Sequence, residues 1–333
     1  MGCFKISSFI FKCDKLIISI SDIIIALVNS SLNNPLMNKD FFNEFKILDG
    51  GMGQELLARG IKAESDLWSA SALANKEYHQ IIKDCHLDFI NAGAEIILTN
   101  TFTCRRTRLE NNKIENRFEE LNSTAVKIAN QAVKESGKKI HIAGSLPPQN
   151  FTYIPDLGDK AKTKKNFYDQ AKILNEGVDL FYLDVMSSFE ECEIAIQSIK
   201  DFNKPFIIGV HFKKNSLLPS GERLKDVIAK LKDFKPLAIT GSCVHYNDII
   251  SAKDDFKNLD IPFGFKMNAF KEIPEGWKPD ASNPNLVLGK NEDITVLKFQ
   301  EIAKEFIDMG AKLVGGCCEV GPNHIKKISE LRN

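Results

Sequence analysis

The sequence predicts a single (β/α)8 barrel, and three observations support this fold class. From residue 45 onward, short apolar segments alternate with longer amphipathic segments to the end of the chain. Eight of the apolar segments qualify as strands, which is the number that closes such a barrel. The structural alternative is a doubly wound open sheet, but no G-x-G-x-x-G follows the first strand, so the usual dinucleotide fingerprint is missing.

The expected elements follow one another in the order strand, helix, strand. The predicted strands span residues 46–48, 95–98, 139–143, 180–183, 206–210, 237–240, 262–265 and 312–314. The predicted helices are amphipathic and span residues 76–92, 117–135, 164–176, 189–200, 222–232 and 296–309. Four helices are followed by a glycine that can end them in a left-handed conformation: Gly93, Gly137, Gly177 and Gly310.

The first 36 residues do not share this pattern. A mainly apolar run from Leu16 to Val28 is interrupted by two serines and Asp22, and it is too short and too polar to span a bilayer. No clear small-residue cleavage site of a signal peptide follows it. We therefore predict that residues 1–36 are an extension outside the fold, that Met37 is the start of the native protein, and that residues 37–333 form the barrel domain.

The composition excludes some classes of function. Lys and Arg together number 44, as do Asp and Glu, and no basic block is interleaved with aromatic residues, which argues against a nucleic-acid surface. Eight cysteines at irregular spacing in 333 residues do not resemble the disulfide framework of a small secreted domain. We expect a cytoplasmic protein with a few functional thiols and no membrane partner.

Three of the cysteines are placed to meet in space. Cys317 and Cys318 come after two glycines at the end of the eighth predicted strand, and Cys243 comes after the sixth. The C-terminal ends of all strands meet at one mouth of a (β/α)8 barrel. Three thiolates with one open position are typical of a catalytic zinc site, whereas a thiol redox pair is the alternative. Cys85, Cys104 and Cys192 are interpreted as small buried apolar residues.

Polar residues at the ends of other strands point to the same mouth. Asp49 follows the first strand, Asn100 the second and Ser145 the third, and Asp184 ends the fourth. Asp49 also begins a glycine-rich segment, which is either a tight turn or a place where the backbone approaches a ligand closely.

With these residues assembled, the chain over about residues 46–330 resembles the homocysteine S-methyltransferase family. The motifs that carry the resemblance are Ile47-Leu48-Asp49-Gly50-Gly51-Met52-Gly53, Leu67-Trp68-Ser69-Ala70, Thr99-Asn100-Thr101-Phe102, Ala143-Gly144-Ser145-Leu146, Tyr153-Ile154-Pro155-Asp156, Gly315-Gly316-Cys317-Cys318 and Pro322-Asn323-His324-Ile325. The resemblance implies a barrel in which Cys243, Cys317 and Cys318 hold one zinc ion and Asp49 helps to hold the substrate's amino group. We expect Asn100, Thr101 and Asp184 to contact the substrate as well.

The chain departs from the family pattern at three places. Asp184-Val185 stands where the family usually has Glu-Thr, Glu319-Val320 stands where it has Gly-Thr, and the common Asn before Cys243 is absent. The resemblance implies transfer of a methyl group to homocysteine from a small onium donor such as S-methylmethionine or betaine, because no segment remains for a cobalamin or folate module. The alternative is a non-catalytic zinc-binding or thiol-redox sensor.

Overall fold

The computed structural model describes residues 37, 39–62, 65–257, 259–274 and 288–332. Contacts divide the chain into two compact units, of which Lys39–Asn333 contains all the strands and helices given below. The predictions about residues 1–36 lie outside the described residues. Within the described part of the chain, no helix combines the length and the apolar character needed to cross a membrane.

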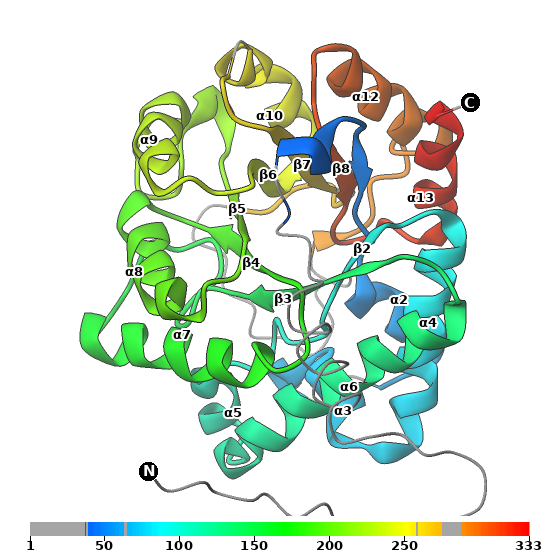
Figure 1. Ribbon diagram of the computed structural model, residues 1–333, viewed down its shortest axis with the longest axis vertical. Coiled ribbons are helices and arrows are strands. Elements are labelled where there is room, and N and C mark those ends of the chain that lie inside the picture. The colour runs from blue at the N-terminus through cyan, green and yellow to red at the C-terminus, as the bar shows by residue number, and fades with distance from the viewer. Residues whose placement is uncertain (1–36, 38, 63–64, 258, 275–287, 333) are drawn as a thin grey trace, which may run out of the picture. The chain divides into compact units, whose positions relative to one another are not determined.

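The predicted barrel is confirmed. All strands pair in parallel in the order β1-β8-β7-β6-β5-β4-β3-β2, and a further bridge between Leu48 and Ile96 brings the two ends of this sheet together. The strands form a ring that helices surround (Figure 1). Their bounds are β1 Lys46–Ile47, β2 Ile96–Leu98, β3 His141–Leu146, β4 Leu180–Met186, β5 Phe206–Val210, β6 Ala238–His245, β7 Phe263–Asn268 and β8 Leu313–Gly316.

The six predicted helices are present, with their ends shifted by a few residues. They are α4 His79–Ala92, α6 Phe118–Ser136, α7 Lys160–Leu174, α8 Phe189–Ile199, α9 Leu224–Leu231 and α12 Val296–Asp308. Side-chain caps begin three of them, at Asp159, Ser188 and Thr295. Gly93 and Gly137 end α4 and α6 with positive φ, as expected of C-terminal glycines.

Short helices complete the outer layer. They are α2 Met52–Ala58, α3 Ala70–Ala74, α5 Arg106–Asn111, α10 Tyr246–Ser251 and α13 Pro322–Ser329. Helices of one or two turns carry too little apolar periodicity to be recognised in a sequence.

The core lies between the ring of strands and the helices. Phe181 of β4 and Phe265 of β7 are fully buried, and the ring of Phe265 packs edge to face on that of Phe306 in α12 at 5.0 Å. The backbones of β7 and β8 also lie very close to each other. A Cβ added to Gly264 of β7 would lie 1.7 Å from the carbonyl oxygen of Leu313 in β8, so only glycine fits there.

Five strands extend further toward the mouth than the sequence predicted. Ser145 and Cys243 therefore lie within β3 and β6 and do not follow those strands, and Asp184 lies within β4 and not at its end. The apolar pattern stops before these residues, but the ladder of parallel pairs continues, for example from Val244 opposite Met267 to His245 opposite Asn268. Backbone hydrogen bonding, which the side-chain pattern does not report, sets the true ends of the strands.

Candidate metal centre and active site

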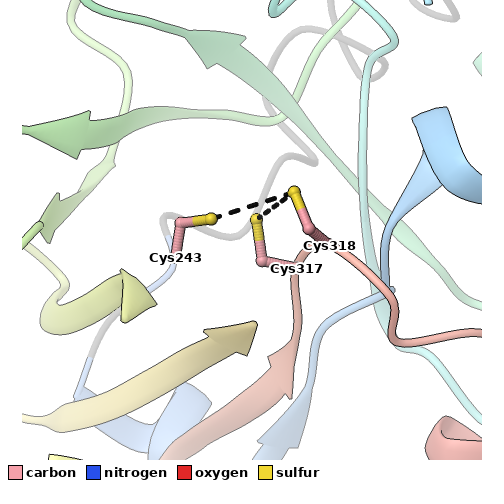
Figure 2. A group of neighbouring side chains, drawn as sticks. All are labelled: Cys243, Cys317 and Cys318. Carbon is pink, nitrogen blue, oxygen red and sulfur yellow. Dashed lines mark hydrogen bonds between the residues drawn. The ribbon is translucent and has the colours of Figure 1, made fainter. Parts of the chain in front are cut away.

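The three cysteines singled out from the sequence converge at the mouth of the barrel. Cys243 comes from β6, and Cys317 and Cys318 directly follow β8. The sulfur atoms of Cys243 and Cys317 each lie 3.9 Å from that of Cys318, and all three lie within 4.8 Å of one another. Figure 2 shows the three side chains pointing toward a common centre.

This spacing fits a soft metal ion. A tetrahedral ion with metal–sulfur distances of about 2.3 Å holds its sulfurs about 3.8 Å apart, close to the observed separations. Three sulfur ligands leave the fourth position of a tetrahedron open. The cluster can therefore hold a metal ion and still accept one further ligand.

Irregular backbone aims Cys243 at this centre. The pairing of β6 with β7 shifts register between Ser242 and Val244, so Cys243 is an extra residue in its strand with φ of 52°. Such a bulge redirects a side chain and interrupts the regular alternation of the strand. The Asn268 amide donates a 2.7 Å hydrogen bond to the Cys243 carbonyl and holds the bulge in place.

Glycines bring the other two cysteines to the centre. A Cβ on Gly315 would lie 2.4 Å from the Leu48 side chain, and one on Gly316 would lie 2.0 Å from the Val320 side chain. The end of β8 can pack this closely on Leu48, just after β1, and on Val320 only because both residues lack a side chain. The Cys317 amide then donates to the Met267 carbonyl at 2.7 Å.

The thiols influence one another's charge. Burial alone would raise the pKa of the Cys243 thiol, but hydrogen bonds from Cys317 and Cys318 hold it well below its usual range. The phenol of Tyr153, 3.1 Å from the Cys243 sulfur, acts in the same direction. This lowered pKa favours the thiolate form of Cys243, which suits the binding of a cation.

An aromatic wall surrounds the sulfurs. Trp68, Phe102, Tyr153 and Phe270 belong to one apolar cluster with the three cysteines. Tyr153 and Trp68 occur in motifs that carried the family resemblance, but the sequence alone assigned them no place beside the thiols. The Trp68 indole N–H is buried and finds no acceptor among the described residues.

Asp49 presents an open carboxylate oxygen. The side chain is 1% exposed, and its Oδ2 accepts a 2.8 Å hydrogen bond from the Leu98 amide. No described residue donates to its Oδ1. Burial raises the pKa of Asp49 to about 7, although the Lys266 charge and the Leu98 amide draw it downward.

Asp184 has a partner that the sequence did not predict. Its Oδ2 accepts from the ammonium of Lys266 at 2.7 Å, and its Oδ1 accepts from the Ser242 hydroxyl. Lys266 is 5% exposed and lies in β7, just beyond the residue where we expected that strand to end. Burial alone would lower the pKa of Lys266, but the Asp184 carboxylate holds it well above its usual range.

Asn100 and Thr101 lie in the loop after β2, beyond Thr99, and are buried. The Asn100 amide donates to the Ser69 carbonyl at 3.2 Å, and the Thr101 hydroxyl donates to the Ser145 carbonyl at 2.7 Å. These bonds tie the loop after β2 to neighbouring segments. The hydroxyl of Ser145 itself has no partner in the described part of the chain.

His211, which follows β5, was not among the predicted site residues. Its ring lies 4.6 Å from that of Tyr153, and burial lowers its pKa to about 4, so the imidazole is neutral at pH 7. A cavity of about 740 Å³ opens beside these two rings, and Lys213, Lys271 and His245 also line it.

Comparisons with known proteins point to one family. The model of the family described as homocysteine S-methyltransferase matches residues 46–332. Homocysteine S-methyltransferase 1 of Saccharomyces cerevisiae is 25% identical over 307 residues, covering 85% of this chain and 92% of that protein. Betaine–homocysteine S-methyltransferase 1 of Danio rerio is 25% identical over 310 residues, covering 86% of this chain and 72% of that protein.

A solved structure shows the same fold. The metallated form of the homocysteine methyltransferase MmuM from Escherichia coli superposes with a TM-score of 0.72 at 20% identity, covering 89% of this chain and 99% of that one. The match of the family model spans the whole barrel, from β1 to the residues after α13. The chain therefore belongs to the homocysteine S-methyltransferase family.

Proposed function

We propose that the protein is a zinc-dependent enzyme that transfers a methyl group from a small onium donor to the thiolate of homocysteine, giving methionine. The observation that carries this proposal is the three-thiol cluster at the barrel mouth, with sulfur spacing suited to a tetrahedral ion. The names of the relatives supply the acceptor, and the metallated form of the Escherichia coli protein supports a bound metal.

The chemistry needs an ionised acceptor thiol. A free alkyl thiol has a pKa near ~8.5 and is only a few per cent thiolate at neutral pH. Zinc bound by Cys243, Cys317 and Cys318 would favour the thiolate and leave it electron-rich, because three anionic ligands already surround the ion. The chain's own groups then have to position the acceptor and exclude water.

Asp49 is suited to hold the acceptor's ammonium through its open Oδ1. Asn100, Thr101 and Asp184 are further buried polar groups at the barrel mouth. In the transfer, a sulfur–carbon bond forms while the bond from the methyl carbon to the onium atom breaks. The electron pair of the broken bond stays on the onium atom, which becomes neutral, so no general acid is required.

The aromatic wall supports an onium donor. Indole and phenol rings attract a cation placed over their faces, most strongly where water is excluded. Trp68, Phe102 and Tyr153 lie beside the sulfurs, where the methyl group has to arrive. S-methylmethionine, betaine, a related sulfonium and S-adenosylmethionine all carry such a cation, and the adjoining cavity is large enough for a small ligand.

The proposal is tested by incubating zinc-loaded protein with homocysteine and each donor carrying a trideuterated methyl group. Mass spectrometry should find labelled methionine with at least one donor, and none with the Cys318→Ala variant. Stable binding of zinc without labelled methionine from any donor would reject the enzyme and favour the non-catalytic zinc-binding or thiol-redox sensor.

A further inference from the structure

We propose that Lys266 is a built-in counter-ion for Asp184, so that Asp49 alone recognises the acceptor's ammonium. The acceptor site then also takes ω-mercapto carboxylates that lack an amino group. The inference rests on the proposed function, since it concerns the acceptor subsite of that reaction.

The first argument is the geometry of Asp184. One oxygen accepts from Lys266 at 2.7 Å and the other accepts from Ser242, so both already have donors before any ligand arrives. A substrate ammonium at this carboxylate would meet the positive charge of Lys266 at close range, and the two cations would repel each other.

The second argument is burial. The side chains of Lys266 and Asp184 are 7% and 3% exposed, so neither charge can be solvated if the pair separates. A ligand that displaced Lys266 would leave a buried cation without a partner, which costs more than one new ammonium contact returns.

The third argument is that Lys266 cannot readily move away. Its backbone lies in the middle of the sheet, paired with Ser242 of β6 on one side and Gly315 of β8 on the other. Its ammonium lies 5.3 Å from the centre of the Tyr182 ring, and the Tyr182 hydroxyl is itself bonded to Thr240 at 2.6 Å.

Asp49 offers the contrast. Only its Oδ2 is engaged, by the Leu98 amide, while its Oδ1 has no donor within the described residues. One charge-assisted contact to an ammonium corresponds to a preference of about 10- to 150-fold, and two would correspond to roughly the square of that factor. The number of available carboxylates therefore sets how strictly the acceptor must carry an amino group.

The test compares homocysteine with 4-mercaptobutanoate, which is homocysteine without its amino group. The measured quantity is the ratio of kcat/KM for the two thiols with the donor that proves active, together with the ratio of their Kd values by calorimetry. We expect the wild-type protein to prefer homocysteine by about 10- to 150-fold in both ratios.

Variants separate the two carboxylates. Asp49→Asn should reduce the preference to within about threefold of unity, whereas Asp184→Asn should leave it near the wild-type value. In Lys266→Met the freed Asp184 should become a second ammonium site, and the preference should rise by about tenfold or more. The double variant Asp184→Asn, Lys266→Met removes both charges and should return to the wild-type ratio. Zinc content should stay at one per chain in all of them.

The inference would be overturned if Asp184→Asn reduced the preference for homocysteine as strongly as Asp49→Asn does. It would also be overturned if a folded, zinc-loaded Lys266→Met protein kept the wild-type preference. The calorimetric ratios separate this inference from the proposed function. If no donor yields a methylated thiol but the binding ratios follow the expected pattern, the enzymatic proposal fails and the role of Lys266 stands.

Discussion

Glu95 at the closed end of the barrel and several polar groups at the mouth differ in how completely hydrogen bonds satisfy them. At the closed end, both carboxylate oxygens of Glu95, just before β2, have donors: Lys46 on one, and the Ile47 amide and Arg332 on the other. At the mouth, several buried polar atoms lack a partner among the described residues: Asp49 Oδ1, Ser145 Oγ, His211 Nε2 and Trp68 Nε1. Groups left open in this way are ready to bind a ligand.

Backbone strain is distributed in the same way. Positive φ at the closed end occurs at Asn203 and Lys235, where short helices end before β5 and β6. Around the sulfurs it occurs at Trp68, Tyr153, Val185, Cys243 and Glu319. A β-branched residue such as Val185 rarely adopts this conformation, and each case costs about 1–3 kcal/mol. The regular end of the barrel thus supplies the stability that permits strain at the other.

We expect the largest difference between the two ends when a cysteine at the mouth is replaced. In Cys318→Ala the metal site loses one of three ligands, so we expect zinc to be lost and activity to fall by about a thousandfold or more. The melting temperature should change by no more than about 4 °C, because one small side chain is removed from a large core. Metal analysis, kinetics and thermal melts followed by circular dichroism measure these effects.

Chelation of zinc from the wild-type protein provides the matching control. The barrel has its own core, so the chelated protein should retain its far-ultraviolet spectrum, unlike a zinc finger. Cooperative unfolding on chelation would show that the mouth, and not only the closed end, holds the fold together.

At the closed end, we expect Gly264→Ala to lower stability while leaving activity unchanged, which is the opposite of the effect of Cys318→Ala. The added Cβ would clash with backbone atoms of Leu313, so β7 and β8 must separate. We expect a loss of at least about 3 kcal/mol in the free energy of unfolding, with kcat per folded molecule unchanged. Denaturant titration and active-site counting measure the two quantities.

The control is Gly144→Ala in β3. There the three atoms nearest to the added Cβ would be side-chain atoms of Leu174 and Phe181, at 3.3 Å, and these can shift. The expected loss is about 1 kcal/mol. Equal losses in the two variants would mean that close backbone packing is not what distinguishes the closed end.

The difference between the closed end and the mouth also explains which features the sequence could predict. The alternation of apolar and amphipathic segments predicted every strand, because strands buried on both faces read as apolar runs. It predicted the convergence of Cys243 with Cys317 and Cys318, because barrel topology brings strand ends together. It did not predict the Asp184–Lys266 pair. A single lysine inside an apolar run normally extends to solvent, and the signal was only its position in Gly264-Phe265-Lys266-Met267. Nor could it predict the bulge at Cys243, since bulges depend on register between strands.

Relief of strain at the mouth should produce a smaller, stabilising effect. Glu319 has φ of 63°, and its buried Oε1 finds no donor among the described residues. Glu319→Gly places at this position the residue that the family resemblance leads us to expect there. We expect a gain of about 1 kcal/mol in the free energy of unfolding, with one zinc retained. Asn203→Gly at the closed end should change stability by only about 0.3 kcal/mol, because asparagine tolerates positive φ. A gain at Asn203 as large as that at Glu319 would contradict the idea that strain is concentrated at the mouth.

The smallest effect concerns the ion pairs of the closed end. Glu95→Gln keeps a side chain that can still accept hydrogen bonds but removes the charge that pairs with Lys46 and Arg332. These side chains are 19% to 29% exposed, so solvent screens the interaction and the expected loss is about 0.5–1 kcal/mol. Because salt screens exposed charges, the difference in unfolding free energy between wild type and variant should shrink in 1 M NaCl. The preference for homocysteine over 4-mercaptobutanoate should not change, since the lost charge lies at the end of the barrel away from the sulfurs. A loss of several kcal/mol in the free energy of unfolding that does not depend on salt would instead show that Glu95 acts as a buried structural charge. The stability of the closed end would then depend more on this one ionic centre than on its packed strands.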